Sequence, residues 1–393
     1  MVRKYPKEPL AIEPLAGQIG AHKQCGADGA GYTALCPDAL WEDAMAMFGD
    51  QKTPRRSVLK GLAAAAFPMP AIAQAPVELR VGIANASSDI GFFLGMKKGW
   101  YREEGISLST TPFRSAADMV APMASGQLDV GGGSVSAGFY NAYERGIKLR
   151  VVADKASSQP GYGVNKCLIA KKHIESRRFK QLSDMKGMKV ATNAPGNSGW
   201  GSLWGYLRAA GLGYDDIDTL DLGYPEHVLA LQNGAVDAGV TTEPSATLAI
   251  MKGYAVVATT DDVTRPRHAI AQLLYSEKMA GNSDLGKRFM KAYIRSIRYY
   301  YGAFKDGKLS GENAEEIIAV LTESTAIKDP EVYRTITPNG IDPDGKIDIP
   351  SLKEDQQVYR DKGWLQSKTS VEEVLDMSFL EAALRELGPF KKT

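Results

Sequence analysis

A short polar turn in the middle of the chain has the residue types that bind an anion without a charged side chain. The segment from Met188 to Leu203 reads MKVATNAPGNSGWGSL. We expect a buried strand over Lys189 to Thr192, and Asn197 or Ser198 as the N-cap of the following helix. Because a helix start leaves N–H groups unpaired at the positive end of the helix dipole, this turn can hold an anion or another hydrogen-bond acceptor.

Further candidate ligand-binding residues follow other predicted strands, since the carboxyl ends of parallel strands meet at one edge of a sheet. Glycine lets the backbone approach a ligand, and serine or threonine supplies a hydroxyl. The earlier candidates are Asn85, Ser87, Ser88, Gly133, Ser134, Ser136 and Tyr162. The later candidates are Gly196, Asn197, Ser198, Gly199, Trp200, Tyr224, Thr241, Thr242 and Glu243.

Several of these residues also have a purely structural interpretation. Asn197 and Ser198 can simply cap a helix, and capping and ligand binding can coexist. Gly133 suits a plain turn equally well, whereas Ser134 is favoured as a ligand residue because we expect it at a helix start. Trp200 can stack on a flat ligand, as can Tyr224, but core packing is the favoured role of Trp200.

Acidic residues and histidines are less specific signals. Glu243 has two interpretations, contact with a cationic amine or locking of the turn before Pro244, and we favour the structural one. Glu226 also follows a predicted strand. Asp129 and Asp237 occupy matching positions and suit turns or lobe packing. The histidines have no metal-ligand spacing, so we expect neither a metal nor a cofactor.

Two residues that follow a predicted strand complete the set of candidate ligand-binding residues. We expect that strand over Leu149 to Ala153, which leaves Lys155 and Ser157 to follow it and reach the cleft.

Length and composition indicate a soluble protein with two lobes. The chain has 393 residues, 24% of them charged, with a net charge of +1. This balance gives no reason to expect nucleic-acid binding. No apolar run reaches the roughly 18 residues that a membrane-spanning helix needs.

The N-terminal region resembles an export signal. Residues 54–75 carry Arg55 and Arg56, then a short apolar run and small residues typical of a cleavage site. This pattern resembles a twin-arginine signal, although Val58 stands where that signal prefers phenylalanine. Residues 1–53 form an unusually long leader, and Met45 or Met47 is an alternative start. Cys167 is the single cysteine after the signal, which excludes an internal disulfide there.

Strands and helices alternate after the signal, which predicts an α/β fold with a largely parallel sheet. The pattern then restarts: Val81 aligns with Val190 at an offset of 109, and Gly126 aligns with Gly234 at an offset of 108. Two α/β units in tandem are therefore expected, although any two βαβ units look alike.

The connections between the units are predicted to be strands. Val164 to Ala170 is long enough to cross between lobes, while Ala255 to Thr259 and His268 to Tyr275 can carry the chain back. The helical stretches after Ser276 are expected to pad the first lobe.

Several motifs in one order resemble bacterial periplasmic solute-binding proteins of the sulfonate, nitrate and thiamine-precursor type. They are GFFLGMKKGWYREEGI from Gly91, GQLDVGGG from Gly126, LSDMKGMKV from Leu182 and NGAVDAGVTTEP from Asn233. The resemblance is good from Val77 to the mid-260s and loose beyond. None of these motifs is specific for one ligand.

The resemblance implies a two-lobed type II periplasmic binding protein fold with hinge strands between two α/β lobes. Lobe 1 would comprise residues 77–165 and 266–393, and lobe 2 residues 166–265. Such a receptor traps a small molecule and passes it to an inner-membrane ABC permease with its ATPase. We expect a periplasmic monomer that binds a small organic anion of the sulfonate or carboxylate type.

Three alternatives remain at this point. A thiamine-precursor pyrimidine is another possible ligand. An enzyme of pyrimidine or menaquinone-precursor synthesis resembles this family, but the pyrimidine type needs several cysteines and the menaquinone type a general base, for which only Glu226, Glu243 or His227 are candidates. A regulator's sensor domain would need a DNA-binding helix pair or a membrane anchor, and neither is apparent.

Overall fold

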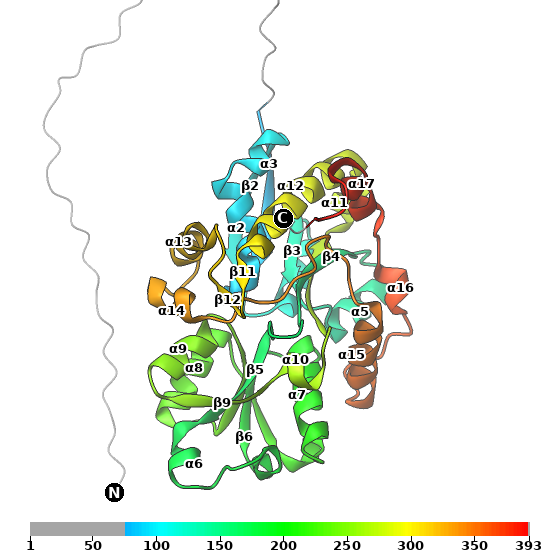
Figure 1. Ribbon diagram of the computed structural model, residues 1–393. Helices are drawn as coiled ribbons and strands as arrows, with labels where there is room; N and C mark the ends of the chain where they lie inside the picture. Colours follow the sequence, from blue (N-terminus) through cyan, green and yellow to red (C-terminus); the bar gives the residue numbers. More distant parts are fainter. Residues whose placement is uncertain (1–74, 392–393) are drawn as a thin grey trace, which may run out of the picture. The chain divides into compact units, whose positions relative to one another are not determined.

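The computed structural model describes residues 75–391, and the predictions for the leader and for residues 54–74 lie outside this range. Within it, two five-stranded mixed sheets each carry helices (Figure 1). We call the sheet β2-β1-β3-β10-β4 with its helices lobe 1, and the sheet β7-β6-β8-β5-β9 with its helices lobe 2. Among the described residues, no helix combines the length and apolar character that crossing a membrane requires.

The strands of each sheet are short and largely buried. Lobe 1 contains β1 (Val77–Ile83), β2 (Ile106–Pro112), β3 (Val130–Gly133), β4 (Arg150–Ser157) and β10 (Ala269–Tyr275). Lobe 2 contains β5 (Asn165–Ala170), β6 (Lys189–Thr192), β7 (Asp218–Asp221), β8 (Ala238–Thr242) and β9 (Ala255–Thr260). A small hairpin joins β11 (Phe304–Lys305) to β12 (Lys308–Leu309).

The helices follow the strands in alternation and then dominate the C-terminal part. Those before β10 are α2 (Ile90–Lys97), α3 (Trp100–Glu103), α4 (Val120–Ala124), α5 (Ala137–Glu144), α6 (Lys171–Glu175), α7 (Ser198–Ala209), α8 (Tyr224–Asn233), α9 (Ser245–Met251) and α10 (Asp261–Thr264). Those after it are α11 (Glu277–Gly281), α12 (Ser283–Gly302), α13 (Ala314–Ser324), α14 (Pro330–Thr335), α15 (Ile349–Asp361), α16 (Val371–Val374) and α17 (Ser378–Leu387). Short 3-10 turns are η2 (Ser87–Asp89), η3 (Ala116–Met119), η4 (Leu182–Met185) and η5 (Tyr214–Asp216).

The two sheets repeat one another, which confirms the tandem arrangement predicted from the offsets. In both, three strands are parallel and the other two run antiparallel to their neighbours, so each sheet is mixed. Asp129 accepts a hydrogen bond from the backbone N–H of Arg80 at 3.0 Å, and Asp237 does the same for Lys189 at 3.1 Å. The matching aspartates therefore tie equivalent strands together, as the structural interpretation predicted.

The crossings between lobes differ from the predicted hinge strands. β5 pairs with β8 and β9 along its length, so it lies within the lobe 2 sheet. The chain passes between the sheets through residues 158–164 and again through residues 261–268.

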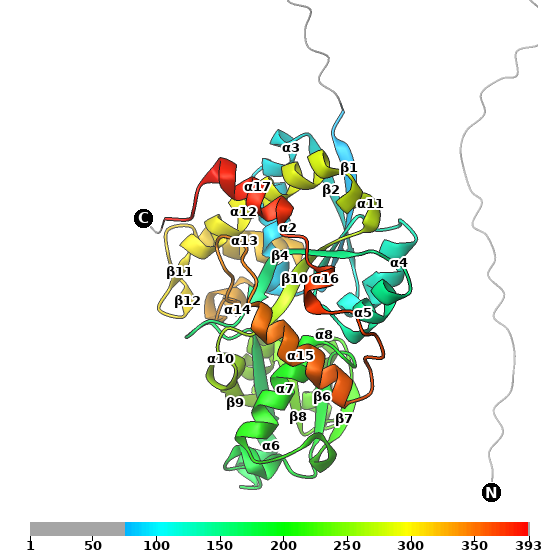
Figure 2. The same cartoon turned by 90° about the vertical axis from the view of Figure 1, so that its right-hand side faces the viewer.

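The C-terminal helices cover more than lobe 1. α12 packs on α2 and α17 (Figure 1). Its Phe289 and Tyr293 join Phe92 in the main core of lobe 1. However, α14 contacts α9, and α15 lies along α7 of lobe 2 (Figure 2). The prediction that these helices pad lobe 1 is therefore confirmed for α12 and α17, whereas α14 and α15 also contact the other lobe.

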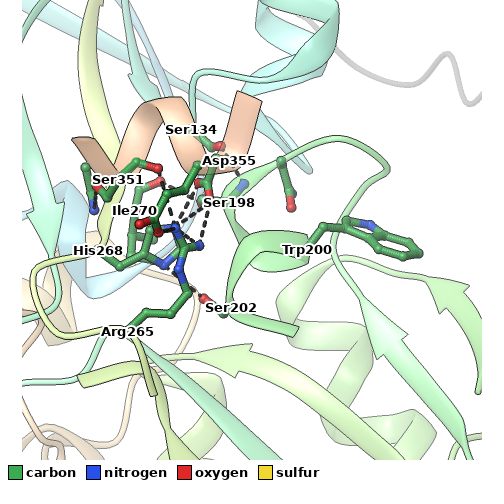
Figure 3. Close-up of polar contacts among 12 residues, drawn as sticks. Ser134, Ser198, Trp200, Ser202, Arg265, His268, Ile270, Ser351 and Asp355 are labelled. Atoms are coloured by element: carbon green, nitrogen blue, oxygen red, sulfur yellow. Dashed lines mark hydrogen bonds and ion pairs between the residues drawn. The ribbon is translucent and has the colours of Figure 1, made fainter. Parts of the chain in front are cut away.

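A buried charge network fastens α15 to the second crossing. Asp355 of α15 accepts hydrogen bonds from Arg265 Nη1 at 2.5 Å and pairs with His268 Nε2 at 2.8 Å (Figure 3). Only 3% to 5% of the Arg265 and Asp355 side chains is exposed. Such a pair costs desolvation energy unless its geometry is good, so its main effect is to fix this crossing in one position.

Candidate functional site

A small cavity of about 40 Å³ lies between the two lobes. Its lobe 1 wall comes from the ends of β1 and β3, from β4 and from the start of β10. Its lobe 2 wall comes from the starts of α7, α8 and β5 and from the end of β8. Strand ends of both sheets therefore converge on one hollow, which is where α/β sheets place ligands.

Seven of the sixteen predicted ligand residues line this cavity. They are Ser88, Gly133, Ser134, Asn197, Ser198, Tyr224 and Thr242. The other nine are not in its wall: Asn85, Ser87, Ser136, Tyr162, Gly196, Gly199, Trp200, Thr241 and Glu243.

Lys155, which the sequence predicted would reach the cleft, lines the cavity, but from within a strand and not from beyond its end. The predicted strand ended at Ala153, but β4 continues to Ser157 and carries Lys155 inside the sheet. Its side chain is 1% exposed, and of the described residues that line the cavity it alone is charged. The cavity therefore offers a ligand a charged side chain in addition to the polar turns.

Asp89 holds Lys155 in place. The Nζ atom lies 3.0 Å from Asp89 Oδ1 and donates to Ser88 Oγ at 2.9 Å. The second carboxylate oxygen of Asp89 accepts from the backbone N–H groups of Ala84 and Ala86 at 3.1 and 3.0 Å. Since an ammonium has three N–H donors, one remains for an acceptor in the cavity.

Gly132 makes room for this lysine. A Cβ atom at Gly132 would stand 2.7 Å from Lys155 Cε and 2.7 Å from the ring of Phe92. Gly132 lies in β3, not in a helix-opening turn. The glycine is therefore required by the packing of the lysine stem.

The two corners singled out from the sequence contact each other across the lobes. Ser198 donates its backbone N–H to Ser134 Oγ at 2.8 Å (Figure 3). Ala137 donates its N–H to Gly196 O, also at 2.8 Å. Ser198 Oγ also donates to Ile270 O at 2.7 Å. The donors expected to be free for a ligand are thus paired, because the facing lobe supplies their acceptors.

Helix capping at these corners follows the sequence only in part. Asn197 caps α7 and accepts from Gly199 N at 2.9 Å, as predicted. Ser134 does not open a helix, since α5 begins at Ala137 and Ser136 is its N-cap. The loop between Gly133 and Ser136 instead turns the Ser134 hydroxyl toward lobe 2.

Two further bonds join the lobes around the cavity. Ser87 donates its N–H to Glu243 O at 3.0 Å. Asn193 Nδ2 donates to Arg114 O at 2.9 Å. These contacts describe lobes that are closed on one another.

Glu243 has the structural role that we favoured. Its buried carboxylate accepts from the backbone N–H and the hydroxyl of Thr247, both at 2.9 Å. Lys166 Nζ lies 3.0 Å from the same carboxylate. The hydrogen bonds and the ion pair of this carboxylate are all made to residues of lobe 2. Because one of them is to a backbone N–H in the first turn of α9, Glu243 caps that helix.

Three other candidates are used in packing. Trp200 forms an edge-to-face pair with Trp364 at 4.5 Å, and points away from the Ser134 corner (Figure 3). Tyr162 stacks on Phe304 at 4.9 Å. Thr241 Oγ1 lies 2.8 Å from His227 Nδ1 in the interior of lobe 2.

Tyr224 and Asn165 add two polar side chains to the lining of the cavity. The Tyr224 hydroxyl has no hydrogen-bond partner within residues 75–391, and burial raises its pKa, so it stays protonated. Asn165 is 1% exposed; its Nδ2 donates to Ser202 Oγ at 2.9 Å, while its Oδ1 is unpaired among the described residues.

The remaining lining residues were missed for identifiable reasons. They are Ala84, Ala86, Ser115, Ala116, Val164, Asn165, Asn193, Ile270 and Ala271. Ser115 and Ala116 follow β2, so the strand-end rule, applied to every strand, would have found them. Asn165 and Ile270 begin antiparallel strands, and the parallel-strand rule does not select such positions.

Histidines and acidic side chains form no candidate metal site. Within residues 75–391 no group of three or more metal-ligating side chains comes together. His173 pairs with Asp237 at 2.6 Å, and His268 pairs with Asp355. Each of these two histidines is therefore paired with a carboxylate that helps to pack the lobes.

The fold and the family follow from comparison with known proteins. The arrangement of two sheets is that of periplasmic binding proteins: the nitrate-binding protein NrtA of Synechocystis PCC 6803 superposes with a TM-score of 0.65 at 13% identity, covering 80% of this chain and 89% of its own. The alkanesulfonate-binding protein SsuA of Xanthomonas axonopodis pv. citri, solved with MOPS, gives 0.60 at 17% identity, covering 77% and 98%.

Residues 73–322 match the model of the NMT1-like family, and the chain belongs to that family. A Bacillus subtilis (strain 168) protein named for binding aliphatic sulfonates is 25% identical over 323 residues, which is 79% of this chain and 89% of that protein.

The contacts between the closed lobes predict the effect of a substitution at Gly196. Its φ is +65°, and a Cβ atom there would lie 2.8 Å from Ala137 Cβ in the facing lobe. We expect Gly196→Ala to lower stability by about 1–2 kcal/mol through backbone strain. We also expect weaker ligand binding, because the clash exists only when the lobes are closed.

Gly187→Ala is the matched control for this variant. Gly187 has a φ of +72° with nothing within 4 Å of a Cβ atom. Urea unfolding should show similar losses for both variants, whereas calorimetry should show weaker binding for Gly196→Ala alone. Equal affinities would contradict the role of this contact in closure.

Proposed function

We propose that the protein is an extracytoplasmic receptor that captures a small organic anion between its lobes and delivers it to an ABC importer. The observation that carries this proposal is Lys155, a buried ammonium in the wall of an inter-lobe cavity with one N–H left for a ligand. A sulfonate or carboxylate oxygen is the acceptor that such a donor prefers. The Tyr224 hydroxyl supplies a second donor.

The comparisons support this class of ligand. Relatives of this chain are named for binding aliphatic sulfonates, alkanesulfonates and nitrate, all of them anions. Two of the structural relatives are named as a component of an ABC-type import system and as a periplasmic nitrate-binding protein, whereas another is a desulfurization enzyme on a similar fold. The predicted twin-arginine segment would take this chain to the same compartment in folded form.

Binding would act by favouring the closed lobes. A ligand that contacts both walls interacts with the closed arrangement better than with an open one, and so shifts the population toward it. Roughly micromolar affinity, about 8 kcal/mol, is ordinary for such a pocket. We expect a monomer, since the site is complete within one chain.

Nucleophilic catalysis has no support in the site. Cys167 is the single cysteine of residues 75–391, and it is fully buried in lobe 2. Burial raises the pKa of its thiol to about 12, so the reactive thiolate is not formed at neutral pH. His227 lies outside the cavity wall and bonds to Thr241 and to backbone oxygens.

Two measurements test the proposal. Mass spectrometry of small molecules released from the purified protein should reveal an organic anion. Calorimetry with a panel of sulfonates, carboxylates, nitrate, amines and sugars should show binding confined to anions. Binding of amines or neutral sugars alone would rule the proposal out.

A further inference from the structure

A second and larger cavity, called the outer cavity below, adjoins the first one and shares part of its lining. It measures about 400 Å³ and shares Ala84 and Tyr224 with the inner cavity. Its walls again come from both lobes, with Phe113 and Arg114 on one side and Leu222 on the other. The two cavities are therefore neighbours along one inter-lobe cleft, with Tyr224 between them.

The inner cavity is too small for a whole organic ligand. A water molecule needs roughly 10–15 Å³ of such space, so about 40 Å³ holds about three water-sized groups. This is the size of an anionic head group beside Lys155. The rest of an organic anion has to lie elsewhere, and the adjoining cavity is ten times larger.

The outer cavity combines apolar side chains with three charged ones, Arg114, Asp221 and Glu226. Phe113, Leu222 and the ring of Tyr224 offer partly buried apolar surface. Arg114 and Glu226 are exposed at its edge, and Arg114 pairs with Asp118 at 3.4 Å. An apolar chain or ring gains most from such a wall, because its transfer from water is favourable and needs no polar partner.

We propose that the ligand is an amphipathic organic anion, with its head at Lys155 and an apolar body of about four to six carbon atoms between Phe113 and Leu222. This inference rests on the proposed function and adds the ligand's body to it. Phe113 and Leu222 then determine specificity for length, while Lys155 and Tyr224 bind the head.

A series of straight-chain alkanesulfonates from methane- to hexanesulfonate tests the inference by calorimetry on the whole protein. Affinity should rise about three- to fourfold for each added methylene, the factor that corresponds to about 0.8 kcal/mol per buried CH₂. Phe113→Ala should flatten this rise while leaving methanesulfonate binding unchanged. Tyr224→Phe should weaken all members equally, because it removes only the hydroxyl.

Leu222→Ala provides a second variant should Phe113→Ala fail to fold. Its matched control is Leu229→Ala, which makes the same change on a 59% exposed side chain outside both cavities. Only Leu222→Ala should reduce the length dependence. Alkanesulfonates that bind with one affinity at every length overturn this inference and leave the proposed function intact. Failure of every anion to bind overturns both.

Discussion

A Lys155→Met variant is expected to bind an organic anion about 10- to 150-fold more weakly, the factor corresponding to 1.5–3 kcal/mol for a hydrogen bond to a charged group. It should also lose about 3–5 kcal/mol of folding stability, because Asp89 would keep a buried charge without its partner. Calorimetry with an alkanesulfonate measures the first effect, and urea unfolding measures the second.

Lys166→Met is the matched control for the loss of a buried lysine. Lys166 is 5% exposed and pairs with Glu243 at 3.0 Å, but it does not line the cavity. This variant should therefore lose stability in the same way and keep its affinity. If both variants lost affinity equally, destabilisation would explain the result and the assignment of Lys155 to the ligand would fail.

The Asp89→Asn variant tests whether removing a negative charge beside Lys155 raises or lowers the affinity for an anion. The amide oxygen can still accept from the backbone of Ala84 and Ala86, while Lys155 loses the negative charge that offsets its own. Anion affinity should then stay the same or increase. A large decrease would mean that Asp89 is needed to position Lys155 and that this outweighs the gain in positive charge.

The positions of these groups explain which parts of the fold and of the site could be predicted from the sequence. Strand and helix periodicity predicted the tandem units, and strand ends predicted cavity residues such as Ser88, Ser134, Asn197 and Tyr224. Those rules depend on local spacing, which a single sequence contains. They succeed wherever a residue's place in its own strand-to-helix turn decides its exposure.

Lys155 shows what the sequence could not supply: it predicted that this side chain reaches the cleft, but not that it lies buried inside a strand. A prediction from sequence pattern ends a buried strand before a lysine, because burying an unpaired ammonium costs free energy. Its burial depends on Asp89 in another turn and on the missing side chain of Gly132 in a neighbouring strand. The pairing of Ser134 with Ser198 likewise depends on how the lobes face one another, and nothing local encodes that.

α15 illustrates the same limit at the level of packing. Its apolar periodicity predicts that one face is buried, but not against which lobe. The partner is selected by the buried Asp355 through Arg265 and His268, which lie about ninety residues earlier in the chain. Ion pairs of this kind are specific only once the fold has brought them together.

Two buried groups are expected to give opposite pH dependences of stability that nearly cancel. Burial raises the pKa of Asp154 to about 7, and burial lowers the pKa of His227 to about 4. The proton on folded Asp154 stabilises the protein fully below pH 4, and this stability is lost as the pH rises through 7. Neutral His227 contributes fully above pH 6.5, and its contribution is lost as the pH falls toward 4.

Single variants should expose each contribution. Between pH 7 and pH 5, Asp154→Asn should lose about 2 kcal/mol relative to its own value at pH 7, because only His227 still titrates. His227→Gln should gain a similar amount over the same interval. The two residues lie in different lobes, so the double variant should show little slope in either direction.

The hydrogen bonds of both groups make these substitutions suitable. Asp154 accepts from Ser157 Oγ at 2.8 Å and from Asp342 N at 2.9 Å, which an amide oxygen can also do. His227 Nε2 lies 3.2 Å from two backbone oxygens, so it carries the proton and Nδ1 accepts from Thr241. Urea unfolding at pH 5, 6 and 7 measures the slopes. If the stability of both single variants changed with pH in the same direction, this account would be contradicted. Burial raises the pKa of Asp154 and lowers that of His227, so the two single variants must respond to pH in opposite ways.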